Sequence, residues 1–369
     1  MTNSSIGLVH DYLLVMRGAE RTFAEIASCW PDAPIYTLLY DEAGTDRCFE
    51  GREIHASFLQ RLRVRQRGFR RFLPFFPRAV EHLPVGSCDL VVSSSSAFAH
   101  GVRAAAGAVH VCYCHSPFRY AWHERERALA EARRPMRPQL RRTLDQIRSW
   151  DLAASRAVTH YIANSDLTRI RMERYWGREA GAVIHPPVEV DRFAVGEPED
   201  FLLIVTELVA HKRVDLALDA ARRAGCRVKV VGVGPERQRL ARRYDGRGAE
   251  FLGRVSDGGL EDLYARARAL VVPNVEEFGI AAVEAQAAGR PVLAADGGGA
   301  RETVIDGSTG ILVPSGSVDA LAEAMSQTDF DRFSPERIRA NAARFSTEVF
   351  RARFLAEMTR LAGNSGMRA

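Results

Sequence analysis

The chain has 369 residues, which exceeds one ordinary hydrophobic core and suits two domains of about 150 to 200 residues each. Its composition of 46% apolar, 26% charged and 8% aromatic residues excludes a disordered or a fibrous protein. The 51 Lys and Arg residues against 46 Asp and Glu residues leave a formal charge of +5. So modest an excess does not indicate a nucleic-acid-binding protein.

The sequence also bears on the compartment. No apolar run reaches the roughly 18 residues that a membrane-spanning helix needs, and no basic segment precedes the short apolar stretch at the N-terminus. We therefore expect a protein of the cytoplasm. The six cysteines form neither CxxC pairs nor a zinc-like spacing with histidines, so we expect reduced, mostly buried thiols and no structural metal.

Short β-like runs recur along the chain, each followed by a glycine-bearing turn and a stretch with helical periodicity. This pattern is typical of parallel βαβ units. The first set of predicted strands lies at residues 6–10, 90–93, 109–113 and 159–163. The second set lies at residues 201–205, 227–231, 250–253, 269–272 and 291–294. Pro186 and Pro187 stop regular structure between the sets. We predict two doubly wound α/β domains, 1–187 and 188–344, each with a crevice at the carboxyl ends of its strands.

Two glutamates flank the start of a predicted helix in the second domain. The helix begins near Gly279 and ends near Gly289, and its free N–H groups and dipole can hold phosphate or sugar oxygens. Glu276 precedes the helix by about one turn. Glu284 lies one turn inside it and can accept two hydrogen bonds from a vicinal diol such as ribose hydroxyls. The alternative is that Glu284 is a surface carboxylate on an ordinary helix and that Glu276 is a loop residue near a helix N-terminus.

The two glutamates are eight positions apart with Phe278, Gly279 and Ile280 between them, and this segment resembles the E-x7-E motif of retaining glycosyltransferases of family 4. The resemblance implies the GT-B fold, with two Rossmann-like domains facing a cleft. It implies that Glu276 lies by the donor sugar and that Glu284 binds the nucleotide ribose. It also implies an acceptor-binding first domain, a nucleotide-sugar-binding second domain and a C-terminal helix, within 345–369, that crosses back to the first domain.

Two further segments resemble phosphate-binding parts of this family. Residues 17–21 are similar to its G-G-A-E-R loop, in which Gly18 and Ala19 would lie by the donor diphosphate, although Arg17 replaces the first glycine. A capped surface turn is the alternative. Residues 205–213 are similar to the segment whose Arg and Lys neutralise the diphosphate. Lys212 matches the Lys, whereas Glu207 reverses the charge of the Arg, and Arg213 is expected to take over its role.

A third match narrows the family to a subgroup. Residues 113–122 resemble the Y-C-H-[ST]-P-x-R-Y-x-W signature of bacterial O-antigen and exopolysaccharide mannosyltransferases, which implies that His115 faces the donor sugar. The segments around His10 and Phe76 fit the same subgroup. Gly234, Arg254 and Val255 lie in stretches similar to the loops that receive the nucleotide base.

Arginines concentrate in two places. Seven lie between Arg61 and Arg78 with no acid and with interleaved aromatic residues, and six lie between Arg133 and Arg148 with only Asp145. A solvated face is one interpretation, and a membrane-surface patch at Arg61 to Arg78 is its rival. We do not expect nucleic acid, because no recognition module accompanies the arginines.

Together these features predict a retaining, metal-independent hexosyltransferase without a cofactor. It would transfer mannose from GDP-mannose to a polyprenyl-diphosphate-linked saccharide in cell-surface polysaccharide synthesis, at the inner face of the cytoplasmic membrane. The expected catalytic residues are His115, Lys212, Arg213 and Glu276. The alternatives are a transferase that uses a UDP-sugar, a glycoside hydrolase, a nucleotide-sugar epimerase and a non-catalytic nucleotide-sugar-binding protein.

Overall fold

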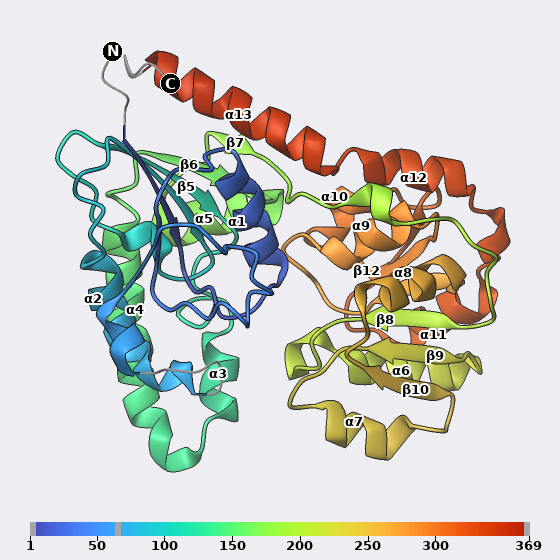
Figure 1. Cartoon of the computed structure of the whole chain (residues 1–369). Helices are drawn as coiled ribbons and strands as arrows, with labels where there is room; N and C mark the ends of the chain where they lie inside the picture. Colours follow the sequence, from blue (N-terminus) through green and yellow to red (C-terminus); the bar gives the residue numbers. More distant parts are fainter. Residues whose placement is uncertain (1–4, 63–67, 365–369) are drawn as a thin grey trace. The chain divides into compact units, whose positions relative to one another are not determined.

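The computed structural model describes residues 5–62 and 68–364. They form two compact units, each built on one parallel β-sheet (Figure 1). The first unit extends to Pro186 and resumes at Phe350, and the second extends from Pro187 to Val349. The predicted divisions lie nearby, after Pro187 and before Phe345. The predicted fold class, two doubly wound parallel-sheet domains, is confirmed.

Seven strands form the sheet of the first unit in the order β3-β2-β1-β4-β5-β6-β7. Their bounds are β1 Ile6–His10, β2 Ile35–Thr37, β3 Ile54–Ala56, β4 Leu90–Ser95, β5 Val109–Cys114, β6 His160–Ala163 and β7 Ala182–Val183. The sequence predicts β1, β4, β5 and β6 but not β2, β3 and β7. The missing strands have only two or three residues, too few to display a strand pattern.

Helices cover both faces of this sheet, because successive residues of a strand point to opposite sides. Leu8 packs with α1 and α13, whereas Val9 packs with α2 and α4. The helices are α1 Gly18–Ser28, α2 Phe76–Glu81, α3 Arg125–Glu131, α4 Arg137–Ala154, α5 Asp166–Trp176 and α13 Thr347–Asn364. Four 3-10 segments complete the unit: η1 Phe58–Leu62, η2 Phe69–Phe75, η3 Ala99–Gly101 and η4 Arg134–Met136.

Six strands form the sheet of the second unit in the order β10-β9-β8-β11-β12-β13. Their bounds are β8 Leu202–Val205, β9 Val228–Val231, β10 Ala249–Gly253, β11 Ala269–Val272, β12 Val292–Ala295 and β13 Gly310–Val313. Only β13, at the edge, is not predicted from the sequence.

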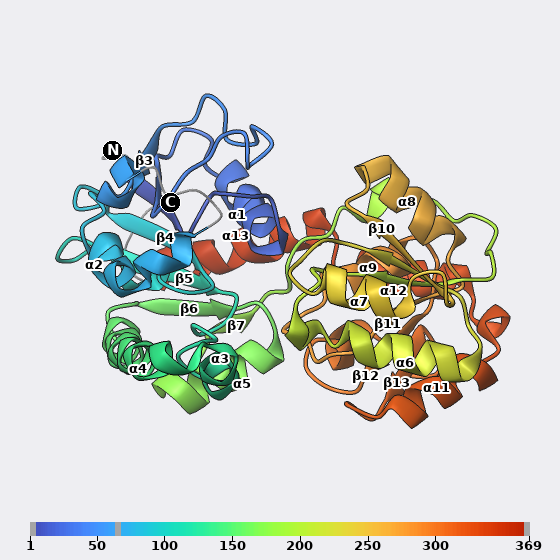
Figure 2. The same cartoon turned by 90° about the horizontal axis from the view of Figure 1, so that it is seen from below.

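The core of the second unit also has two halves. Leu202 and Ile204 pack with α6 Val214–Ala224, α7 Arg237–Tyr244 and α11 Val318–Gln327, and α6 and α7 lie in front of the sheet in Figure 2. Leu203 faces the other side, with α8 Asp257–Arg266, α9 Ile280–Ala287 and α10 Ala300–Thr303. The remaining elements are η5 Val190–Arg192, η6 Ala210–Lys212, η7 Phe330–Arg332 and α12 Pro335–Ala343.

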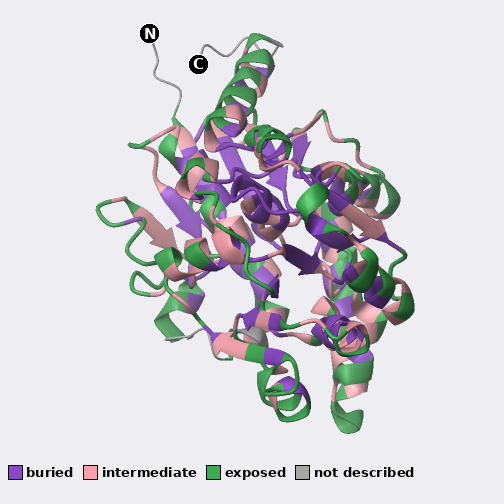
Figure 3. Ribbon diagram, turned by 90° about the vertical axis from the view of Figure 1, so that its right-hand side faces the viewer, coloured by how far each residue is buried: buried purple, intermediate pink, exposed green. Residues whose placement is uncertain are grey.

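Burial follows this layering. Figure 3 shows the strands mostly in purple and the outward sides of the helices in green. Of the six free cysteines, Cys88, Cys112 and Cys114 are buried and Cys48 is exposed, so the prediction of mostly buried thiols is correct for half of them.

No helix within the described ranges combines the length and the apolar composition required to span a bilayer.

Each sheet reverses its strand order at one place. In the first unit this switch point lies between β1 and β4, and in the second between β8 and β11. Doubly wound sheets bind ligands outside the carboxyl ends of the strands at such a point. Each unit therefore has its own candidate site region, in the loops that follow the two strands at its switch point.

Candidate active site

The loops after β8 and β11 bring two predicted site residues into direct contact. The Lys212 ammonium donates to both carboxylate oxygens of Glu276, with Nζ 2.6 Å from Oε1 and 2.6 Å from Oε2. The two side chains are 18% and 19% exposed. They are 64 positions apart in sequence, and the neighbouring positions of β8 and β11 in the sheet account for their contact.

A buried amide donates a further hydrogen bond to the Glu276 carboxylate. Asn274 follows β11, is 8% exposed, and donates from Nδ2 to Glu276 Oε1 over 3.1 Å. Asn274 is not among the site residues predicted from the sequence. Its position directly after Pro273 at the end of a predicted strand is the signal that could have found it. The Glu276 carboxylate therefore accepts three hydrogen bonds from other side chains of the protein.

The glycine loop after β12 supports the same segment. The Gly299 amide donates to the Glu276 carbonyl over 3.0 Å. A Cβ on Gly299 would lie 2.1 Å from the Phe278 carbonyl oxygen, so only glycine lets the two backbones approach this closely. Phe278 is buried and packs edge-on against Phe345 at 5.4 Å between ring centroids. The conformation of the 276–279 loop thus depends on packing contacts from distant parts of the chain.

Helix α9 begins where the sequence predicts. Gly279 is its N-cap with φ of 92°, a left-handed conformation that glycine adopts without strain, and Ile280 is the first helical residue. Because no side chain caps this end, backbone N–H groups of the first turn can donate to an anionic oxygen. Glu284, one turn further, accepts a hydrogen bond from the Tyr264 hydroxyl over 2.8 Å. Tyr264 is fully buried against Phe193 and is a second site residue that was not predicted from the sequence.

The second cation beside Lys212 is only partly available. Arg213 is the N-cap of α6 with φ of 50°, uncommon for a residue with a side chain. Its guanidinium is 48% exposed and lies 3.8 Å from the Asp215 carboxylate. Glu207, at the position where the resemblance expects an arginine, is exposed on the same segment. Lys212 is thus the better-placed cation at the end of β8.

The loops expected to receive the base pack directly on the β8 segment. A Cβ on Gly234 would lie 2.2 Å from the Leu208 carbonyl oxygen, and one on Gly232 would lie 1.8 Å from the Thr206 carbonyl oxygen. Backbone therefore contacts backbone there. Arg254 and Val255 follow β10, the first exposed and the second half-buried.

In the first unit, a serine ladder along β4 pairs with histidines. Ser93 Oγ lies 2.7 Å from His110 Nε2, Ser94 Oγ 2.8 Å from His115 Nε2, and Ser95 Oγ 3.3 Å from His100 Nδ1. His115 is buried after the carboxyl end of β5 and is held in place by Ser94. The run of serines at 93–96 is the sequence signal that could have predicted these pairs.

The switch point of the first unit carries a fully satisfied carboxylate. Asp11, after β1, accepts hydrogen bonds from the amides of Ser96, Phe98 and Ala99 and from the Ser96 hydroxyl. This carboxylate stabilises the turn that leads into η3. His10 beside it is stacked on Phe23, and burial lowers the pKa of His10 to about 3, so its imidazole is neutral at physiological pH.

The predicted diphosphate loop of the first unit is a capped helix start. Gly18 and Ala19 open α1, Arg17 is the N-cap, and the Arg17 amide donates to Glu20 Oε2 over 3.2 Å. Burial raises the pKa of Glu20 to about 7. The capped turn that the sequence offers as an alternative therefore exists, and it leaves a helix N-terminus at this position.

The predicted residues thus divide between the units. Gly18, Ala19 and His115 belong to the first unit, and the other predicted residues belong to the second. Within the second unit Lys212 and Glu276 are in direct contact. Among the described residues, no group of three or more His, Cys, Asp and Glu side chains is arranged to hold a metal ion.

The family assignment now has independent support. Residues 16–192 match the family described as Glycosyltransferase Family 4, and residues 188–345 match the family described as Glycosyl transferases group 1. Together the matches cover most of the chain and coincide with the two units. The chain belongs to the GT-B glycosyltransferases of family 4.

Relatives of known name match part of the chain. A D-inositol 3-phosphate glycosyltransferase of Catenulispora acidiphila is 36% identical over 191 residues, 42% of this chain and 44% of the relative. A GDP-mannose-dependent alpha-(1-6)-phosphatidylinositol monomannoside mannosyltransferase of Mycobacterium tuberculosis is 32% identical over 200 residues, 46% of this chain and 52% of the relative. The chain thus spans about half the length of the curated relatives it matches.

Solved structures share the whole fold. HepE of Anabaena in complex with UDP superimposes with a TM-score of 0.72 at 18% identity, over 96% of this chain and 100% of that chain. Sucrose-phosphate synthase of Thermosynechococcus elongatus superimposes with a TM-score of 0.74 at 16% identity, over 98% and 100%. At these identities the likeness concerns the fold alone.

Proposed function

We propose that the protein transfers a hexose, mannose from GDP-mannose, with retention of configuration onto a polyprenyl-diphosphate-linked saccharide. The observation that carries this proposal is the contact between Lys212 and Glu276 beside the uncapped N-terminus of α9. A cation and free amides suit a diphosphate, and a neighbouring carboxylate suits sugar hydroxyls. The mycobacterial relative named for GDP-mannose supports the choice of donor.

The proposed chemistry breaks the bond between the sugar anomeric carbon and the diphosphate oxygen. Negative charge then develops on the leaving nucleotide, where Lys212 and the amides of α9 stabilise it, with Arg213 as a second cation. The acceptor hydroxyl forms the new bond on the same face of the sugar, and its proton passes to the departing phosphate. Glu276 and His115 hold the donor sugar, and Glu284 binds the ribose diol. This scheme uses no metal ion.

The donor diphosphate must compete with Glu276 for Lys212. Lys212 is already neutralised by Glu276 at 2.6 Å, so a diphosphate must draw the ammonium away from the carboxylate. The carboxylate is then released toward the sugar while Asn274 still holds one of its oxygens. In this proposal, Lys212 binds the diphosphate and releases the Glu276 carboxylate in the same step.

The acceptor side of the proposal concerns the membrane. We place the reaction at the inner face of the cytoplasmic membrane, in the assembly of a cell-surface polysaccharide. The mycobacterial relative is named for a phosphatidylinositol monomannoside, which supports a lipid-linked acceptor. The arginines from Arg61 onward support contact with anionic headgroups, although residues 63–67 lie outside the described ranges.

Thermal unfolding of the purified chain with GDP, GDP-mannose, UDP or UDP-glucose tests the donor. A ligand that binds only the folded state raises the midpoint. We expect the guanine ligands to raise it and Glu284→Ala to abolish the rise. A response to uridine ligands alone would retain a transferase and reject GDP-mannose, and no response would reject the donor site.

Product analysis separates the remaining alternatives. Transfer requires both donor and acceptor, and it continues in the presence of EDTA if no metal is needed. An epimerase converts the nucleotide sugar without acceptor, and a hydrolase cleaves a glycoside without nucleotide. A non-catalytic binding protein stabilises with donor but releases no GDP.

A further inference from the structure

The first unit carries a group of exposed arginines whose charges are not neutralised. We call the arginine face the six residues Arg61 on η1, Arg71 on η2, Arg133 and Arg134 at η4, and Arg141 and Arg142 on α4. All six are exposed, and no ion pair to them is recorded among the described residues. So many unpaired arginines indicate an anionic partner, because no ion pair within the protein has to break when they bind one.

These residues lie on neighbouring elements. Segment η2 contacts α4, and η4 leads directly into α4. One hydrophobic cluster beneath them contains Leu59 of η1, Phe72 of η2, and Leu140 and Leu144 of α4. The elements therefore share a core, and their arginines are exposed to solvent.

The acidic residues close to the arginine face are already committed. Asp145 on α4 accepts from Arg125 over 2.6 Å, and Glu81 on α2 accepts from Arg103 and from the Trp150 indole. Two arginines of the second unit, Arg222 and Arg243, differ in this respect, since both pair with Asp219. The positive potential at the arginine face is therefore not cancelled by the acids beside it.

Large apolar side chains accompany these charges. Phe58, Leu62, Phe75 and Met136, on η1, η2 and η4, are 45%, 57%, 54% and 57% exposed. Exposed apolar groups beside arginines suit the boundary between lipid headgroups and acyl chains, where both parts find their preferred surroundings. Duplex nucleic acid offers phosphate but no such apolar layer.

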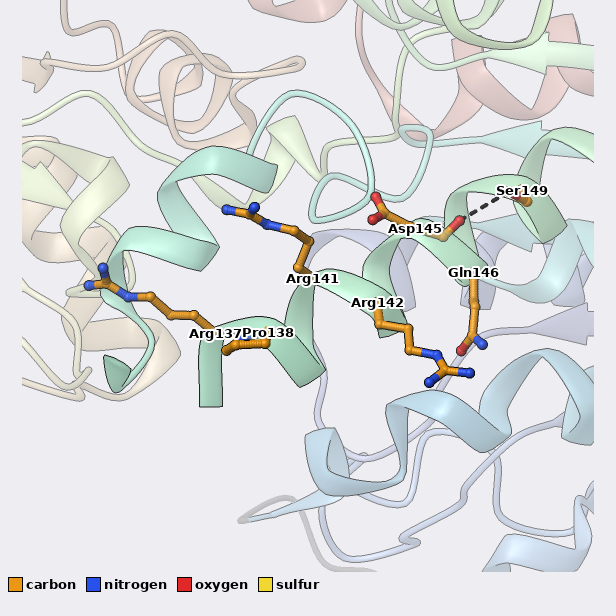
Figure 4. Close-up of a pocket in the computed structure, with 7 residues that line it drawn as sticks. All are labelled: Arg137, Pro138, Arg141, Arg142, Asp145, Gln146 and Ser149. Atoms are coloured by element: carbon orange, nitrogen blue, oxygen red, sulfur yellow. Dashed lines mark hydrogen bonds between the residues drawn. The ribbon is translucent and has the colours of Figure 1, made fainter. Parts of the chain in front are cut away.

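The surface of α4 at this place is hollowed. The hollow is lined by Arg137, Pro138, Arg141, Arg142, Asp145, Gln146 and Ser149 (Figure 4). Arg137 is engaged there, because it donates to the carbonyls of Ala130 and Ala132 at the end of α3. Figure 4 shows Arg141 and Arg142 extending from α4 in different directions, so they can reach separate phosphates.

We propose that the arginine face docks on an anionic bilayer, with the six arginines at lipid phosphates and Phe58, Leu62, Phe75 and Met136 in the interface. Each arginine near such a surface strengthens binding about fivefold, and the apolar side chains add a contribution that salt does not screen. The proposal deepens the proposed function and rests on it only for the membrane-bound acceptor.

Co-sedimentation of the full chain with phospholipid vesicles tests the proposal. One set contains phosphatidylcholine alone, and the other contains phosphatidylcholine with about one third phosphatidylglycerol. We expect binding to the anionic vesicles that weakens as salt is added. The variant Arg133→Glu/Arg134→Glu/Arg141→Glu/Arg142→Glu should bind at least about a hundredfold more weakly. Phe75→Ser/Met136→Ser should also bind more weakly and leave the salt dependence unchanged.

The matched control changes four exposed arginines elsewhere: Arg156→Glu/Arg242→Glu/Arg247→Glu/Arg353→Glu. It alters the net charge by the same amount and should bind the anionic vesicles better than the arginine-face variant. Stabilisation by nucleotide, measured on every variant, should be unchanged. That readout separates a failed membrane proposal from a failed donor site and reports folding.

Three results would overturn the proposal. The first is equal binding to neutral and anionic vesicles, or binding to neither. The second is an equal loss in the control and in the arginine-face variant, which would indicate net charge alone. The third is tighter binding to duplex DNA or RNA than to the anionic vesicles, which would assign the surface to nucleic acid.

Discussion

At the residue scale, the ion pair of Lys212 and Glu276 links two proposed roles, the binding of the diphosphate and the binding of the donor sugar. Each residue is a candidate ligand-binding group, and each is also the other's partner at 2.6 Å. A charge-assisted hydrogen bond of this kind is worth about 1.5–3 kcal/mol. Substituting one partner therefore changes the availability of the other.

Glu276→Gln should separate phosphate binding from sugar transfer. The amide removes the carboxylate that neutralises Lys212, so GDP should bind equally well or more tightly. Transfer should fall about a hundredfold, because the carboxylate that holds the sugar is lost. Calorimetry with GDP and a transfer assay measure the two effects. Lys212→Met is the control and should weaken GDP binding about tenfold or more; loss of GDP binding in Glu276→Gln would contradict these roles.

Tyr264→Phe addresses the expected ribose ligand. The variant removes the hydroxyl that donates to Glu284 over 2.8 Å and retains the buried ring. We expect a stability loss of about 1 kcal/mol and a higher KM for the donor. The preference for a ribonucleotide donor over its 2′-deoxy analogue should also decrease, because Glu284 is less firmly oriented. Tyr244→Phe, on the opposite face of the sheet, should leave that preference unchanged. An unaltered preference in Tyr264→Phe would limit Tyr264 to a packing role.

At the element scale, the loops after β11 and β12 position the site together. Gly299 donates to Glu276 and lies against the backbone of Phe278, while Phe278 packs against Phe345 near the end of the second unit. The geometry of the acidic loop therefore depends on the spacing between two loops. A glycine sets that spacing because it has no Cβ.

Gly299→Ala should disrupt both stability and nucleotide binding. The new Cβ would meet the Phe278 carbonyl at 2.1 Å, so the loops must separate at a cost of about 1–3 kcal/mol. Urea unfolding and the midpoint shift with GDP measure the two effects. Gly258→Ala, in α8 with nothing within 4 Å of its Cβ, is the matched control and should be neutral or stabilising. Equal behaviour of the two variants would contradict the close-approach argument.

At the scale of the whole molecule, a buried carboxylate connects separate parts of the first unit. Asp151 on α4 accepts from the indoles of Trp122 and Trp176, over 2.7 Å and 2.6 Å. Its other oxygen lies 3.4 Å from His100 Nε2. Burial raises the pKa of Asp151 to about 7 and lowers that of His100 to about 4. Between about pH 4 and pH 7 the uncharged form of both groups is therefore favoured.

This network predicts a pH dependence of stability that Asp151→Asn should remove. Because the folded-state pKa of Asp151 is raised from 3.8 to about 7, the folded chain retains a proton that the unfolded chain has lost in that window. The wild-type contribution is therefore lost as pH rises, by about 1.4 kcal/mol per pH unit. The amide can still accept from both indoles.

Urea unfolding across this pH window measures the difference between the variant and the wild type. The stability of Asp151→Asn relative to wild type should increase with pH up to about 7 and then level off. Asp151→Ala is the control for the indole hydrogen bonds and should destabilise at every pH. A difference that decreases with pH would mean that the pKa of Asp151 is lowered by folding.

The sequence by itself determined the fold class, most of the strands and the motif residues Lys212, Glu276 and Glu284. Long apolar runs and local spacing are properties of neighbouring residues, so they can be read along the chain. Short edge strands such as β7 could not be predicted from the sequence, because it is their pairing with a neighbouring strand, and not a residue pattern of their own, that makes them strands.

Only the tertiary structure decided the partners. The site contacts join residues on different elements. They are the contact of Lys212 with Glu276, the hydrogen bonds from Asn274, Tyr264 and Gly299, and the pairing of the β4 serines with histidines. Hydrogen bonds and close packing depend on distances of a few ångströms in space. Sequence separation does not encode those distances. The same reason applies to the arginine face, whose residues become one surface only when η2 packs against α4.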